Sequence, residues 1–187
     1  MKRAVILARG LGRRMRESSP DTVLEAGQES AAARGIKGMI PIGRPFLDYL
    51  LSSLADAGFE EACLVIGPEH QSVRDYYEAP GRLSRMAVSF AVQEEPRGTA
   101  DAVLAAEVFA GGQHFLVCNA DNYYPADVLA ELRALNGPGL AGFAPAALVG
   151  LSNIPAARVT QIALLVEAPG GFLVDVIEEP DPVTAAR

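Results

Sequence analysis

A loop rich in glycine and arginine follows the first apolar run of the chain, and its composition suits phosphate binding. Residues 4–8 are expected to form a buried strand. The loop after it holds Gly10, Gly12, Arg13, Arg14 and Arg16. Glycine lets a backbone approach a ligand closely, exposed backbone N–H groups attract anions, and arginine adds forked donors. A tight turn with solvated arginines explains the same residues equally well.

The loop matches neither of two common nucleotide-binding motifs. In the dinucleotide fingerprint a third glycine would stand where this chain has Met15. A P-loop is excluded because no G-x-x-x-x-G-K-[ST] run occurs anywhere in the sequence. A phosphate site in this loop therefore has to be of another kind.

Two further residues could act on phosphate groups. The chain has only two lysines, Lys2 and Lys37, against fourteen arginines, so Lys37 offers a compact point charge that arginine does not supply. One lysine can also be there by chance. Asp121 closely follows an apolar run, and a carboxylate there could hold Mg²⁺ against phosphate oxygens. Asp121 could equally turn or cap the chain before Pro125.

Alternating strand and helix patterns must position these residues. Strands are expected at 3–8, 62–66, 86–93 and 114–118, and helices at 46–58, 68–78, from 98 onward and at 125–135. This alternation predicts an α/β fold with a mostly parallel sheet and helices on both faces. Ligands bind beyond the carboxyl ends of such strands. The first loop, residues 93–99 and residues 119–122 should meet there.

The remaining segments are less regular. Residues 16–36 are expected to form a long loop with one short helix near 29–34. Residues 139–151 are rich in Gly, Ala and Pro with strand-like pieces, and strands are expected at 159–167 and 172–177 around a turn at 169–171. We expect one domain over 1–187, with a β-rich part from about 138 onward.

Composition limits the class of protein. The 187 residues carry a net charge of −7, which disfavours nucleic acid and anionic membranes as partners. Cys63 and Cys118 lie in apolar runs and are expected to be buried free thiols. No apolar run has the length of a signal peptide or a membrane span, so a cytoplasmic location is expected.

Five segments in order resemble one family, and together they cover essentially the whole chain. The sequence resembles the sugar-1-phosphate nucleotidyltransferases (nucleotide-sugar pyrophosphorylases), nearest to the glucose-1-phosphate thymidylyl- and uridylyltransferases. Each segment alone is a weak signal, whereas their order is specific. The segments are residues 8–15, 37–45, 93–102, 119–122 and 177–180.

The resemblance implies a Rossmann-like nucleotide-diphospho-sugar transferase fold and a reaction. An NTP and a sugar-1-phosphate would give an NDP-sugar and pyrophosphate, with Mg²⁺ as cofactor; the oligomeric state, including a homo-oligomer, stays open. Residues 1–137 would bind the nucleotide and 138–187 the sugar. The implied roles are triphosphate binding by Gly10, Gly12 and Arg14, phosphate contact at the reacting centre by Lys37, nucleobase binding by Gln93 and Gly98, Mg²⁺ binding by Asp121, and a sugar contact by Glu178.

Three features depart from the family pattern. Arg9 replaces a usual glycine, so its side chain must point away from the phosphates or reach one. Glu179 replaces a lysine that contacts the sugar phosphate, and the chain ends at Arg187, before the expected second metal-binding aspartate. We therefore expect a truncated or reduced, impaired enzyme. Two alternatives remain: a molybdopterin nucleotidyltransferase-like enzyme, or a catalytically silent module that binds a nucleotide sugar.

Overall fold

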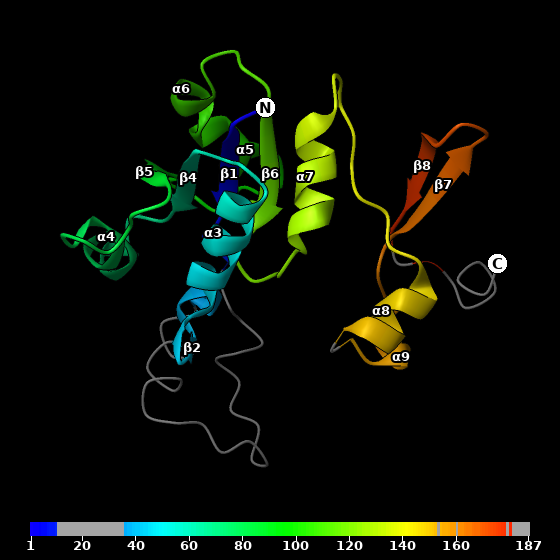
Figure 1. The fold of residues 1–187 in the computed structure, drawn as a ribbon, viewed down its shortest axis with the longest axis horizontal. Helices are drawn as coiled ribbons and strands as arrows, with labels where there is room; N and C mark the ends of the chain where they lie inside the picture. The colour runs from blue at the N-terminus through cyan, green and yellow to red at the C-terminus, as the bar shows by residue number, and fades with distance from the viewer. Residues whose placement is uncertain (11–35, 153, 160, 179, 181–187) are drawn as a thin grey trace. The chain divides into compact units, whose positions relative to one another are not determined.

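The computed structural model describes residues 1–10, 36–152, 154–159, 161–178 and 180, in two compact units, Met1–Gly139 and Leu140–Arg187. The helix expected near 29–34 lies outside the described residues. Figure 1 shows the elements along the chain. Those of the first unit are β1 Arg3–Leu7, η1 Lys37–Met39, β2 Pro41–Ile42, β3 Arg44–Pro45, α3 Phe46–Asp56, β4 Glu61–Ile66, α4 Gln71–Glu78, β5 Ala87–Val92, α5 Thr99–Ala105, α6 Glu107–Ala110, β6 Phe115–Asn119 and α7 Ala126–Ala134.

A parallel four-stranded sheet, in the order β5-β4-β1-β6, forms the centre of the first unit. The expected α/β class is confirmed, and every pairing in the described sheet is parallel. Leu7 at the end of β1 stands level with Val65 of β4 and Asn119 of β6. The segments that follow β1, β4, β5 and β6 therefore all begin at one edge of the sheet.

The two central strands, β1 and β4, are apolar beyond their first residues, Arg3 and Glu61, because helices cover both faces of the sheet. In β1, Ile6 packs in the larger core cluster with Leu50 of α3 and Leu129 of α7. Its neighbour Val5 belongs to a second cluster with Ala102 of α5. Successive side chains point to opposite faces of a strand, so an uninterrupted apolar run is what a doubly covered strand requires.

Three sequence expectations were wrong at the level of elements. The strand expected at 159–167 begins only at Leu164, because Val159 ends a short helix, Ala156–Val159. Pro68 does not open a helix: residues 67–70 form a turn in which His70 N–H donates to Gly67 O at 3.0 Å, and α4 begins at Gln71. Residues 139–151 were expected to contain strand-like pieces, but Pro145 stands at the first turn of a helix, α8. Proline suits this position because the first N–H groups of a helix have no partner within it.

The described residues of the second unit form two short helices and one hairpin, α8 Pro145–Leu151, α9 Ala156–Val159, β7 Leu164–Ala168 and β8 Phe172–Ile177. The strands pair antiparallel through the expected turn, where Gly170 and Gly171 take positive φ angles of 96° and 78°. Among the helices of the described residues, none is long and apolar enough to cross a membrane.

Candidate active site

A pocket of about 350 Å³ lies in the first unit beyond the carboxyl ends of the strands. Its volume falls in the range that small-molecule ligands occupy. Segments that are distant in sequence contribute to it, from the end of β1, from η1, from the stretch after β5 and from the end of β6. The lining residues are Leu7, Ala8, Arg9, Gly10, Lys37, Gly38, Val65, Gln93, Pro96, Gly98, Thr99, Ala102, Asn119, Ala120 and Asp121.

Lys37 and Asp121 form an ion pair at the mouth of this pocket. The ammonium Nζ lies 2.9 Å from the carboxylate Oδ2, and the two side chains are 42% and 37% exposed. Gly38 makes this approach feasible, because a Cβ there would lie 3.3 Å from the carbonyl oxygen of Ala120. A side chain at position 38 would push η1 away from the end of β6. The lysine–glycine pair therefore brings a cation to the aspartate.

Gln93 is a buried polar residue that joins the end of β5 to the start of α5. Its backbone N–H donates to Ile66 O at 2.9 Å, which continues the sheet by one bond. Its side-chain Nε2 donates to Gly98 O at 3.2 Å and to Asp101 Oδ2 at 2.7 Å. Gly98 has a φ of 106°. Residues with a side chain rarely adopt this backbone conformation, so glycine is favoured at this position. The turn between β5 and α5 is thus closed by the amide of Gln93.

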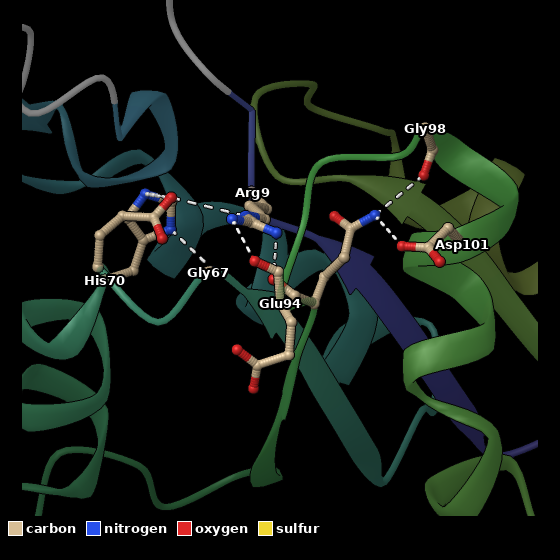
Figure 2. A network of polar contacts seen from close by, with 8 residues as sticks. Arg9, Gly67, His70, Glu94, Gly98 and Asp101 are labelled. Carbon is tan, nitrogen blue, oxygen red and sulfur yellow. Dashed lines mark hydrogen bonds and ion pairs between the residues drawn. The ribbon is translucent and has the colours of Figure 1, made fainter.

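Arg9 holds the same segment from the other side, as Figure 2 shows. The Arg9 side chain is 8% exposed. Its guanidinium donates to the carbonyl oxygen of Gln93, and it donates to the carbonyl oxygen of Glu94 at 3.1 Å. Nε lies 3.5 Å from Glu69 Oε1. A Cβ on Gly67 would lie 2.6 Å from Arg9 Nε, so glycine leaves the space that the guanidinium crosses.

The charges around Arg9 compensate one another. The pKa of the Glu69 carboxyl is lowered, mainly by a hydrogen bond from its own backbone and then by the nearby His70 and Arg9. Arg9, which replaces the expected glycine, is thus bound to carbonyl oxygens and a carboxylate. Of the two possibilities for this side chain, the structure supports the one in which it serves the protein's own backbone.

The structure brings five predicted site residues to one pocket: Gly10, Lys37, Gln93, Gly98 and Asp121. Gly12 and Arg14 lie outside the described residues, as do Arg13, Arg16 and Glu179. Glu178 follows β8 in the second unit and is exposed. The roles of all these residues remain predictions.

Sequence reasoning missed two contributors, Asp101 and Gly38. Asp101 lies in the expected segment 93–102, and Gly38 directly follows Lys37. Their places in these segments were the only sequence signal that could have pointed to them. What each one contacts depends on tertiary structure. The contact of Asp101 with Gln93 and that of Gly38 with Ala120 join residues that no helical or strand periodicity pairs.

The pocket offers little for a metal ion by itself. Asp121 is the one carboxylate among its lining residues, and the described part of the chain contains no group of three or more His, Cys, Asp or Glu residues arranged for a metal. Magnesium prefers hard oxygen ligands and commonly binds through one or two carboxylates together with water and substrate phosphates. Asp121 fits that second mode, since its carboxylate already holds a cation, the ammonium of Lys37.

Comparison with known proteins places the chain in a family. Residues 32–138 match the family model described as nucleotidyl transferase. The bifunctional protein GlmU of Methanococcus vannielii is 35% identical over 105 residues, which cover 56% of this chain and 24% of the relative. The D-glycero-alpha-D-manno-heptose 1-phosphate guanylyltransferase of Aneurinibacillus thermoaerophilus is 26% identical over 126 residues, 67% of this chain and 48% of the relative.

The fold has solved counterparts. A UDP-glucose pyrophosphorylase complexed with UDP-glucose superposes with a TM-score of 0.68 at 17% identity, over 97% of this chain and 70% of that one. At this identity the likeness concerns the fold alone. The chain spans about a quarter to a half of the length of these curated relatives. The matched region includes the segments that carry Lys37, Gln93, Gly98 and Asp121, and the chain belongs to the nucleotidyl transferase family.

Proposed function

We propose that this chain transfers a nucleoside monophosphate from an NTP to a sugar-1-phosphate, giving an NDP-sugar and pyrophosphate. The observation that carries the proposal is the convergence of Gly10, Lys37, Gln93, Gly98 and Asp121 on one pocket of about 350 Å³. A curated relative named as a heptose 1-phosphate guanylyltransferase and another named as a UTP–glucose-1-phosphate uridylyltransferase support the substrate class.

The chemistry needs charge neutralisation more than a protein base. An oxygen of the sugar phosphate attacks the α-phosphorus of the NTP, a new P–O bond forms, and the bond to the β-phosphate oxygen breaks to release pyrophosphate. The attacking oxygen is already anionic, so no proton has to be removed. Two polyanions must instead be brought together, and fixed positive charge lowers that cost.

Lys37 is the described residue best suited to this task. Its ammonium stands at the pocket mouth, and its partner Asp121 is the ligand that we assign to Mg²⁺. Magnesium, when bound, would neutralise phosphate oxygens. Lys37 would then be available to the phosphates at the reacting centre, with Gly10, Gly12 and Arg14 holding the triphosphate. We assign Glu178 to a contact with a sugar hydroxyl. We assign the segment from about residue 138 onward to binding of the sugar. Both substrates are metabolites of the cytoplasm, where we place the protein.

The test is pyrophosphate release from a panel of NTPs and sugar-1-phosphates in the presence of Mg²⁺. We expect release with at least one pair and its loss in Asp121→Asn. The matched control is Asp56→Asn, which removes another exposed, ion-paired carboxylate, 2.6 Å from Arg85 in the structure. Absence of pyrophosphate release across the whole panel would contradict the proposal.

A second candidate, a catalytically silent nucleotide-sugar module, is favoured by one residue. Glu179 stands where the resemblance predicts a lysine, and a carboxylate near an incoming phosphate opposes its binding. Such a module would bind NTP or NDP-sugar in a calorimeter without releasing pyrophosphate. The same panel therefore separates the two candidates.

A further inference from the structure

The side-chain amide of Gln93 has one chemically consistent orientation. Both groups that its nitrogen contacts, the carbonyl oxygen of Gly98 and the carboxylate of Asp101, can only accept hydrogen bonds. A rotated amide would place its own oxygen against two other oxygens. The nitrogen must therefore face Gly98 and Asp101, and the hydrogen bond to the charged partner is the stronger of the two.

The rest of the residue is held as firmly as its amide. The Gln93 N–H is bonded to Ile66 O, its carbonyl oxygen accepts from Arg9, and the whole residue is 4% exposed. Figure 2 shows Arg9 on one side of this segment and Asp101 on the other. With its backbone fixed at both polar groups, Gln93 cannot withdraw its side chain without breaking the network.

Asp101 and Lys37 line two different hollows, and Gln93 lines both. Asp101 lines a neighbouring hollow of about 270 Å³, together with Arg97 and Leu104, whereas Gln93 lines both that hollow and the 350 Å³ pocket. The amide nitrogen is thus occupied by two acceptors, Asp101 from the lining of the hollow and Gly98 from the lining of the pocket. The side-chain carbonyl oxygen, Oε1, accepts no hydrogen bond from any residue in the described part of the chain.

We propose that Asp101 is a specificity-determining positioning residue, because it locks the Gln93 amide so that Oε1 is the group offered to the nucleobase. An acceptor held in this way selects a base with a ring N–H at its pairing edge, as in uracil, thymine and guanine. Cytosine and adenine carry an acceptor at that ring position. This inference rests on the proposed function, since a nucleobase must occupy the pocket.

The test compares nucleotides with their N-methylated counterparts by titration calorimetry in the presence of Mg²⁺. The probes are UTP with 3-methyl-UTP and GTP with 1-methyl-GTP, and ATP and CTP complete the set. Methylation removes the ring N–H and puts a methyl group against Oε1. We expect the unmodified nucleotide to bind at least about tenfold more tightly than its methylated counterpart, the order expected for one lost hydrogen bond in a site.

The diagnostic variant is Asp101→Asn, which keeps the shape but can present an N–H₂ group to Gln93 as well as an oxygen. The charged acceptor of the Gln93 amide is then lost, and Gly98 O alone favours the original orientation, so a fraction of the amides can reverse. We expect the preference for the unmodified nucleotide to fall at least about threefold, because a reversed amide turns its NH₂ group toward the ring N–H of the unmodified base and weakens its binding. A purely structural role of Asp101 in the first turn of α5 would weaken all nucleotides equally and leave this ratio unchanged.

Asp127→Asn is the matched control, because Asp127 is also an acidic residue in the first turn of a helix, α7. Its removal alters the helix terminus in the same way but should leave the ratio unchanged. Melting temperatures of both variants establish that they fold.

A double-mutant cycle gives an independent readout. Gln93→Glu brings a second carboxylate against Asp101, and nucleotide affinity should fall by more than about tenfold while staying measurable at high protein concentration. Adding Asp101→Asn should recover at least about tenfold in affinity, because the new amide can donate to the new carboxylate, whose second oxygen still serves as an acceptor. If Gln93→Glu does not fold, the test rests on the Asp101→Asn variant alone, through its ratio of affinities for the unmodified and the methylated nucleotide.

The outcomes separate the two levels of the proposal. If the unmodified chain binds none of the nucleotides, the proposed function fails and the role of Asp101 fails with it. If UTP or GTP binds but the ratio survives Asp101→Asn, only the positioning role is overturned. Tightest binding of ATP or CTP would also overturn it.

Discussion

Lys37→Met should separate the catalytic role of the lysine from any structural one. The substitution removes the charge and keeps most of the side-chain volume. Lys37 and Asp121 are 2.9 Å apart and each more than one-third exposed. Two charges about 4 Å apart interact by about 1 kcal/mol in water and about 4 kcal/mol near a protein surface, before desolvation and ordering costs. Measured pairs of this exposure contribute about 0.2–1 kcal/mol, so the free energy of unfolding should fall by less than about 1 kcal/mol.

The effect on turnover should be far larger. At the reacting centre the ammonium faces charge that develops in the transition state, and loss of one such group costs about 2–4 kcal/mol, or about 30- to 1,000-fold in rate. Lys37→Arg should stay at least about tenfold impaired, because a planar fork replaces a point charge. Pyrophosphate release and urea unfolding measure the two quantities on the same samples.

Lys2→Met is the matched control. Lys2 is the chain's other lysine and is also ion-paired, 2.7 Å from Glu60, with both side chains exposed. It precedes β1 and so stands at the end of the sheet away from the pocket. We expect its turnover to stay within about twofold of the unmodified chain. Turnover of Lys37→Met above one-third of the unmodified rate would refute the catalytic role, and a loss of stability above about 2 kcal/mol would make the lysine structural.

The other expected outcomes concern the metal ligand and the core. Asp121→Asn should abolish Mg²⁺-dependent nucleotide binding in calorimetry while leaving the melting temperature within a few degrees; loss of folding would support a turn-and-cap role instead. Tyr77→Phe should lower the free energy of unfolding by about 1–3 kcal/mol in urea titrations, because the buried hydroxyl donates to Asp48 at 2.8 Å and the carboxylate would lose that bond. Burial raises the pKa of the Cys118 thiol from 9.0 to about 12. The native state therefore keeps a proton that the unfolded state loses, so stability should be constant for this group below about pH 9 and fall as the pH rises from 9 to 12. Urea midpoints at pH 8 and 10.5 measure this, and Cys118→Ala should weaken the dependence; an unchanged dependence would contradict the assignment.

The position of the pocket was predictable because it follows from strand direction. Apolar runs bounded by turns gave the strands, and parallel pairing puts their carboxyl ends at one edge. The first loop, Gln93 and Asp121 could thus be expected together, whereas Lys37 was placed with them by the family resemblance alone. In the structure Leu7 of β1 stands level with Asn119 of β6. The sequence shows the burial of β1 as the uninterrupted apolar run that begins at Ala4.

The contacts that fix the site were not predictable in the same way. A helix signal at Pro68 competes with the turn that His70 closes, and local pattern does not decide between them. Nor does it decide whether an acidic residue in a first helical turn, such as Asp101, faces solvent or a buried glutamine. Such choices depend on which side chain the neighbouring strand presents, and that is a property of the packed sheet.

Arg9 illustrates how a departure from a family pattern can be absorbed. An extra guanidinium beside a phosphate loop would be expected to bind phosphate, but burial makes a free cation costly, and carbonyl oxygens lie within reach. Directly after β5, which ends at Val92, come the carbonyl groups of Gln93 and Glu94, and Arg9 donates to both. Glu69 supplies the counter-charge across Gly67. The end of β1 is thereby tied to the segment that carries Gln93, so the residues that we propose to bind phosphate and nucleobase are joined through Arg9.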